Sequence, residues 1–211
     1  AVDRLVCRLE ELAAQAASFP PDLILLEATI FYRDRRFGEA LEATEKILAD
    51  QSNLTLAMRA RTYFLRGLIS DRRRDEAGLR KAIEKMGQPQ SETLKSDLAE
   101  LRGRLAMAEN DWNRAVIYLD EATAARRKTL DYRRMATALS LSAEACEKGG
   151  MEQEAAVKYL RAGRSAAYRD DLLNARTWLT KSSVLFDRTG NDFLAAESRS
   201  ILSELDQKPE E

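Results

Sequence analysis

The chain has 211 residues, with 34 Lys and Arg against 35 Asp and Glu, so its formal net charge is -1. It contains 32 Ala and 29 Leu but only 5 Val and 7 Ile. Ala and Leu favour helices whereas β-branched residues favour strands, so this composition argues against a large sheet. The balanced charge lacks the basic excess typical of nucleic-acid-binding domains, and we expect no nucleic-acid partner.

The residue types present exclude several kinds of chemistry. The sequence has no His, which removes Ser-His-Asp and Cys-His catalysis and His-ligated zinc. Its two cysteines, Cys7 and Cys146, are too few for a four-thiolate metal site or a disulfide framework. We therefore expect a protein that is not an enzyme and that carries no cofactor and no metal.

No apolar stretch approaches the ~20 residues that a helix needs to cross a bilayer. The longest candidate is the four-residue run Leu23 to Leu26, so we expect no transmembrane segment in this sequence. The chain begins at Ala1 rather than Met. The compartment is thus left open between the cytoplasm and the periplasm, with any targeting segment upstream of Ala1 removed.

Along the chain, apolar residues recur at steps of three and four, which is the helical period. The first stripe, from Val2 to Ala16, predicts a helix over 1–19 that ends before Pro20 and Pro21. Short polar turns then divide the chain into pairs of helices. We predict a single domain in which these pairs span 21–52, 54–88, 92–128, 131–168 and 171–206.

The helix pairs form a repeat. Ala40, Ala115, Ala155 and Ala195 hold the same place in their helices, with gaps of 75, 40 and 40 residues. A fixed period of this size is typical of solenoid architectures, in which each repeat is one supersecondary unit. The spacing predicts five helical hairpins of roughly 35–40 residues.

These hairpins resemble the tetratricopeptide repeat (TPR) superfamily from about residue 21 to 205, with small residues where helices cross and large ones between them. The matching residues are Ala28, Phe31, Phe37, Ala40, Leu41 and Ile47 in the first hairpin, Gly103, Ala106, Asp111, Trp112, Ala115, Leu119 and Ala122 in the third, Ala143, Cys146, Gly150, Ala155, Tyr159 and Ala162 in the fourth, and Ser183, Phe186, Gly190, Ala195 and Leu202 in the fifth. The resemblance implies a right-handed all-α solenoid of about five hairpins plus the N-terminal helix.

Three features depart from the TPR pattern. Arg199 stands where the superfamily has a large apolar residue, and the second hairpin, 54–88, matches poorly. The 40-residue gaps exceed the common 34-residue repeat, which predicts helices about one turn longer.

The resemblance also implies a concave groove lined by the first helix of each hairpin. The candidate groove residues are Leu25, Thr29, Tyr32, Arg33, Arg61, Phe64, Arg72, Arg104, Met107, Glu144, Lys148 and Arg188. The first two hairpins combine aromatic rings with arginines, which suits an acidic or carboxylate-bearing peptide. The alternative, in which these charges form a solvated face with local ion pairs, stays open.

Three other features have competing interpretations. The basic runs 72–74 and 126–128 are interpreted as inter-helix turns, with a phosphate or anionic-lipid contact as the alternative. Glu144 and Glu147 share one helix face, as catalytic carboxylates or metal ligands do, but general acid–base catalysis also needs a dry cleft. We interpret Cys146 as a small packing residue.

Taken together, these features predict a non-catalytic scaffold that binds a peptide or a partner protein in its groove. One alternative is a self-assembling oligomerisation module or assembly factor, because helices 1–19 and 192–205 could dock end to end into a homo-oligomer. A further alternative is a helical enzyme that uses groove carboxylates.

Overall fold

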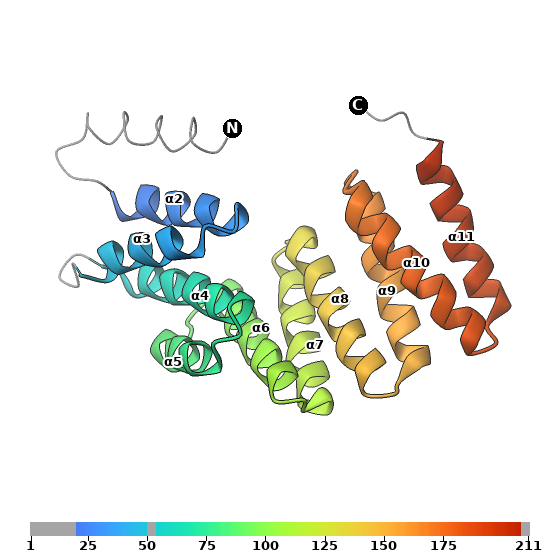
Figure 1. Cartoon of the computed structure of the whole chain (residues 1–211), viewed down its shortest axis with the longest axis horizontal. Coiled ribbons are helices and arrows are strands. Elements are labelled where there is room, and N and C mark those ends of the chain that lie inside the picture. Colours follow the sequence, from blue (N-terminus) through green and yellow to red (C-terminus); the bar gives the residue numbers. More distant parts are fainter. Residues whose placement is uncertain (1–19, 50–53, 208–211) are drawn as a thin grey trace. The chain divides into compact units, whose positions relative to one another are not determined.

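The computed structural model describes residues 20–49 and 54–207, and every regular element in these ranges is an α-helix (Figure 1). The described helices fall into two compact units, within residues 1–90 and 91–211. The helix predicted at 1–19 and its Cys7 lie outside the described residues. The boundary between the units falls between the second and third predicted hairpins, and the single-domain interpretation stays a prediction.

Unit 1 contains two hairpins. Its helices are α2 (Pro21–Arg33), α3 (Phe37–Ala49), α4 (Leu56–Arg72) and α5 (Glu76–Met86). Consecutive helices pack against each other, and α2 also contacts α4. The pairs α2–α3 and α4–α5 lie within the predicted ranges 21–52 and 54–88.

Unit 2 contains three hairpins. Its helices are α6 (Glu92–Ala108), α7 (Trp112–Lys128), α8 (Tyr132–Lys148), α9 (Glu152–Ala167), α10 (Leu172–Arg188) and α11 (Asp192–Asp206). Each of these helices packs against the next one in the chain, as Figure 1 shows. The three pairs lie within the predicted ranges 92–128, 131–168 and 171–206.

Single polar residues both end one helix and start the next. The backbone N–H of Asp111 donates to the carbonyl of Ala106 at 2.9 Å, while its carboxylate accepts from the N–H of Arg114 at 3.1 Å. Asn110, just before it, has φ 60, the left-handed conformation that closes helix C-termini. The turns at Asp75 and Asn191 are built in the same way, so capping chemistry sets the hairpin boundaries.

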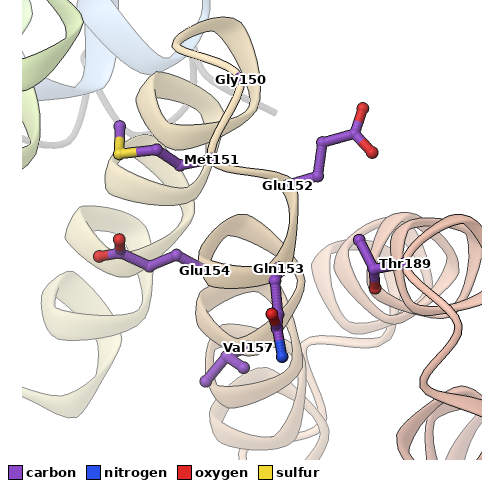
Figure 2. Close-up of a pocket in the computed structure, with 7 residues that line it drawn as sticks. All are labelled: Gly150, Met151, Glu152, Gln153, Glu154, Val157 and Thr189. Atoms are coloured by element: carbon purple, nitrogen blue, oxygen red, sulfur yellow. The ribbon is translucent and has the colours of Figure 1, made fainter.

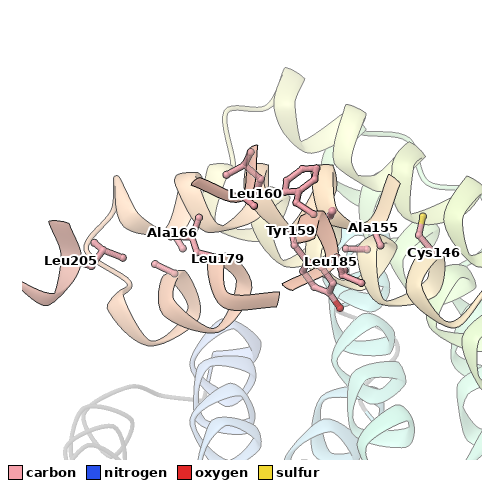
Figure 3. Close-up of a cluster of buried hydrophobic side chains, with 13 residues drawn as sticks. Cys146, Ala155, Tyr159, Leu160, Ala166, Leu179, Leu185 and Leu205 are labelled. Carbon is pink, nitrogen blue, oxygen red and sulfur yellow. The ribbon is translucent and has the colours of Figure 1, made fainter. Parts of the chain in front are cut away.

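Small residues let the helices approach, as the repeat pattern predicts. A Cβ on Gly103 would lie 2.6 Å from Leu119 Cγ within the α6–α7 hairpin, and a Cβ on Gly163 would lie 2.6 Å from Leu179 Cγ, between α9 and α10 of consecutive hairpins. Figure 3 shows the largest core cluster of unit 2, where Tyr159 and Leu185 lie among alanines. Close packing of this kind makes the interior sensitive to a single added methyl group.

Candidate functional site

One hollow in unit 1 gathers cationic and aromatic side chains. It has a volume of about 540 Å³ and is lined by Tyr32, Arg33, Arg35, Phe37 and Arg72. We call it the arginine hollow. It brings together three of the predicted groove residues, Tyr32, Arg33 and Arg72, which come from two different hairpins.

Local structure places these side chains. Arg33 ends α2, Phe37 begins α3, and Arg35 lies in the turn between them with φ 62. This tight reversal brings the rings of Tyr32 and Phe37 to a centroid distance of 6.0 Å, tilted by 48°. Arg72, the last residue of α4, completes the hollow.

The arginines of the hollow are exposed and have no acidic partner among the residues that the structure describes. Within the described residues, Arg33, Arg35 and Arg72 form no ion pair, and no carboxylate lines the hollow. Arg36 is different, because its guanidinium lies 4.6 Å from the centroid of the Phe31 ring and pairs with Glu39. Among the described residues, the hollow therefore carries positive charge that no lining carboxylate compensates, beside two aromatic rings.

The other predicted groove residues of unit 1 do not line this hollow. Leu25 packs against two buried apolar clusters, and Thr29 donates its hydroxyl hydrogen bond to the carbonyl of Leu25 at 2.7 Å. Arg61 is exposed and Phe64 is half-buried on α4. The hollow in unit 1 thus includes only part of the groove residues predicted for the first two hairpins.

In unit 2, most predicted groove residues are engaged with other groups. Lys148 Nζ lies 2.8 Å from Glu144 Oε1 and 5.4 Å from the centroid of the Trp112 ring. Arg188 pairs with Glu152, and Met107 packs against a buried cluster. In unit 2, the ion pairs of Lys148 and Arg188 thus agree with the alternative interpretation, in which the groove charges form a solvated face with local ion pairs.

Arg104 belongs to a buried ionic cluster rather than to an exposed surface. It is 8% exposed, and its Nε donates to Glu100 Oε1 at 2.8 Å. Glu100 also pairs with Arg126, which is 1% exposed and donates to the carbonyl of Arg134 at 2.9 Å. Asp97 Oδ1 lies 3.6 Å from Arg126 Nη2. The same carboxylate also pairs with Arg134. The cluster ties α6, α7 and α8 together.

The two carboxylates of this cluster titrate differently. Burial alone would raise the pKa of Glu100, but the guanidinium groups of Arg104 and Arg126 outweigh it and lower the pKa to about 2. Burial dominates at Asp97 and raises its pKa, although Arg134 and Arg126 act in the opposite direction. Because both carboxylates are enclosed and bound by arginine, the cluster is a structural element.

Ser142 and Lys158 form a second polar cluster that resembles a Ser-Lys catalytic pair in distance alone. Lys158 Nζ lies 2.9 Å from Ser142 Oγ and 2.7 Å from both carboxylate oxygens of Asp120. Burial alone would lower the pKa of Lys158, but the hydrogen bonds and charge of Asp120 raise it. A protonated lysine is no general base, and Ser142 is fully buried.

The repeat explains why this pair exists. Positions forty residues away hold Ser182 and Ser198, whose hydroxyl oxygens are 3.2 Å apart, across the α10–α11 hairpin. Forty residues in the other direction, the Arg102 guanidinium lies 6.0 Å from the centroid of the Tyr118 ring. The same place in three hairpins therefore holds a contact between their two helices, which is a packing role.

Cys146, interpreted as a packing residue, is 0% exposed in the core of unit 2. Burial raises the pKa of its thiol to about 11. The nucleophilic form of cysteine is the thiolate, so this side chain is unreactive at neutral pH.

Unit 2 also has an open hollow of about 710 Å³ where α9 begins, with Thr189 facing it from the α10–α11 turn (Figure 2). Its charged residues already have partners: Glu152 pairs with Arg188, and Glu154 Oε1 lies 3.1 Å from Lys158 Nζ. It thus lacks the uncompensated charge of the arginine hollow.

Within residues 20–49 and 54–207, no helix combines the length and apolar character that a bilayer crossing requires. Over the same residues, no three Cys, Asp or Glu side chains gather as metal ligands.

Sequence reasoning missed two residues of the arginine hollow. Neither Arg35 nor Phe37 is among the predicted groove residues, yet both line the hollow. The signal that could have found them is the turn itself, because a reversal within three residues brings side chains on both of its sides together.

Comparisons with known proteins show the fold. No protein-family model and no curated protein matches the chain. Among solved structures, BtubC (BKLC) from P. vanneervenii matches with a TM-score of 0.66 and 15% identity, covering 100% of this chain and 91% of that one. The apo form of RapI matches with a TM-score of 0.43 and 15% identity, covering 97% of this chain and 66% of that one.

The likeness to BtubC extends over the whole chain, and at 15% identity it shows the fold alone. Together with the helices of both units, it confirms the predicted fold class. The chain has an all-α helical-repeat fold of the solenoid type.

Proposed function

We propose that this protein is a non-catalytic, TPR-like interaction scaffold that binds an acidic segment of a partner protein in the arginine hollow. The observation that carries the proposal is the convergence of Arg33, Arg35 and Arg72 beside the rings of Tyr32 and Phe37, with no carboxylate among the described residues that line the hollow. Guanidinium groups pair with carboxylates through two parallel hydrogen bonds and stack on rings. A peptide with acidic residues around one aromatic residue complements both features.

The absence of catalysis is part of the proposal. Glu147, one of the two carboxylates considered as catalytic, accepts from the Tyr159 hydroxyl at 3.1 Å and lies 3.5 Å from Lys181 Nζ. Glu144 pairs with Lys148. Acid–base catalysis needs a titrating pair directed at a substrate, whereas these carboxylates bind neighbouring cations.

End-to-end self-assembly has less support. Arg199 occupies the place in α11 that Leu119 and Tyr159 hold in α7 and α9, where they are buried. Arg199 is exposed and pairs with Asp187 at 2.8 Å. A charged face of this kind disfavours stacking of α11 on an apolar surface. Light scattering at high protein concentration tests this point, since a monomer contradicts self-assembly.

The binding proposal is tested by fluorescence anisotropy. The probe is a labelled peptide with six glutamates around one phenylalanine, and its control is the same peptide with glutamines. We expect Arg33→Glu and Arg72→Glu each to weaken binding by about tenfold or more, because each removes one charge-assisted contact and adds repulsion.

Arg133→Glu is the matched control variant. Arg133 is exposed on α8 and forms no ion pair within the part of the chain that the structure describes. The Arg133→Glu substitution changes the net charge by the same amount as Arg33→Glu and Arg72→Glu do, but it lies in unit 2. Equal weakening by all three variants, or equal binding of the glutamine peptide, would show non-specific attraction and would refute the proposal.

A further inference from the structure

Unit 1 has a second polar cavity, separate from the arginine hollow. It lies where α3, α4 and α5 meet and has a volume of about 230 Å³. We call it the polar cleft and define it by Glu45, Tyr63, Arg66, Ser70, Arg73 and Lys81. Consecutive arginines of the predicted basic run separate here, since Arg72 lines the hollow and Arg73 lines the cleft.

The cleft has more cationic groups than its acidic groups can satisfy. Arg66 Nη2 lies 3.6 Å from Glu45 Oε1, which is too long for a hydrogen bond. Within residues 20–49 and 54–207, Arg73 and Lys81 form no ion pair. Asp75, the other acidic residue at the cleft, accepts from the N–H of Gly78 at 2.9 Å as the cap of α5. Three cations, Arg66, Arg73 and Lys81, therefore converge on a space lined by two carboxylates, Glu45 and Asp75, which leaves an excess of positive charge.

The size and the neutral groups of the cleft narrow the class of ligand. Its volume is below the roughly 300–1,000 Å³ of ordinary small-molecule pockets, so it suits a compact group. Tyr63 and Ser70 add hydroxyl donors, and Leu41, Leu48 and Ala82 supply apolar walls, which strengthen electrostatic attraction by lowering the local dielectric. A doubly charged oxyanion with several acceptor oxygens matches this set of donors.

We propose that the polar cleft binds the phosphate group of a small soluble molecule through Arg66, Arg73 and Lys81. This site is independent of the partner-binding function, because the two cavities share no lining residue. Loss of peptide binding in the Arg33→Glu variant leaves the phosphate site intact.

Inorganic phosphate is the probe, and ¹⁵N-labelled full-length protein gives the readout. We expect saturable amide shifts centred on residues 63–82 at millimolar phosphate. Lys81→Gln should weaken binding by about tenfold, because it removes one charge-assisted contact. Lys85→Gln, one turn later on the exposed side of α5, is the matched control and should bind as the native protein does.

Two further experiments distinguish a soluble phosphate ester from the phosphate of a lipid headgroup. O-phosphoserine tests a soluble ligand, and phosphatidylcholine vesicles with or without phosphatidic acid test a lipid headgroup. Binding of phosphate and phosphoserine in solution supports the proposal. Binding to the acidic vesicles alone, no saturable shift with phosphate, or equal weakening by Lys81→Gln and Lys85→Gln each overturns it. Circular dichroism checks the fold of each variant, and Tyr63→Phe provides a second test of the same cleft.

Discussion

One group of arginines in unit 1 and one in unit 2 have opposite surroundings. In unit 1, Arg33, Arg35 and Arg72 are exposed, lie around one hollow and have no acidic partner within the described residues. In unit 2, Arg126 is 1% exposed and pairs with Glu100, with Asp97 nearby. The comparison indicates that neighbouring carboxylates decide whether an arginine on these hairpins is part of a buried ionic cluster or part of an exposed surface.

The physical reason lies in the cost of burying charge. Removing an ion from water is expensive, and only an opposite charge with good geometry compensates for it. Arg126 therefore exists in the interior only together with Glu100 and Asp97, and its Nε still has no hydrogen-bond partner. An exposed guanidinium keeps its water and remains able to exchange it for a ligand.

The largest effect on stability is expected from a substitution that breaks the buried ionic cluster of unit 2. Arg126→Met leaves Glu100 and Asp97 enclosed with one cation fewer, and we expect it to lower the free energy of unfolding by about 3–5 kcal/mol. Urea titration followed by tryptophan fluorescence measures this, because Trp112 and Trp178, the two tryptophans of the chain, both belong to unit 2.

Arg127→Met is the matched control, since Arg127 is the exposed neighbour of Arg126 on the same helix. We expect a change within about 0.5 kcal/mol, as for surface substitutions in general. Equal stability of the Arg126→Met and Arg127→Met variants would contradict a structural role for the cluster.

The second expected effect is a dependence of the free energy of unfolding on pH. The pKa of Glu100 is about 2 in the folded protein, against an ordinary value of 4.5. A lowered pKa means that the unfolded chain binds the proton more readily, so Glu100 stabilises the fold above pH 4.5 and loses this effect as the pH falls toward 2. The contribution at neutral pH is about 3 kcal/mol.

Asp97 acts with the opposite sign, because its pKa is raised by burial and its ionised form is the less favourable one in the folded state. The net acid dependence is therefore smaller than that of Glu100 alone. Urea titrations between pH 7 and 2, with tryptophan fluorescence, measure the sum, and ¹³C shifts of the carboxyl groups separate the two residues. Protonation of Glu100 in the folded protein near its ordinary pKa would contradict this account.

Much of the fold could be predicted because its signals are local. Alanines recurring at Ala115, Ala155 and Ala195 mark helix crossings, and residues such as Asp111 and Asn191 mark the turns. A helix period and a cap involve neighbours within a few residues. The helix pairs consequently lie within the predicted hairpin ranges, and the all-α fold class is confirmed.

The site was harder to predict because pairing between helices is not local. Arg104 reads as an exposed groove residue, yet it belongs to a cluster in which Glu100 meets Arg126, 26 residues away. Arg35 reads as part of a turn, yet it lines the arginine hollow. Spacing places a residue on a helix face, but only the packed neighbours decide whether its charge is neutralised.

A stability effect as small as that of Arg127→Met, and a sharp contrast with Arg126→Met, is expected from Arg72→Met in unit 1. Arg72 is exposed and unpaired within residues 20–49 and 54–207, so its removal leaves no buried carboxylate behind. Its like-charged neighbours Arg33 and Arg35 repel it weakly, and the change should be within about 0.5 kcal/mol in either direction. Far-UV circular dichroism during urea titration measures this, whereas tryptophan fluorescence, which reports on unit 2, should not change. A loss as large as that of Arg126→Met would mean that Arg72 supports the fold, and the contrast between the two units would then be wrong.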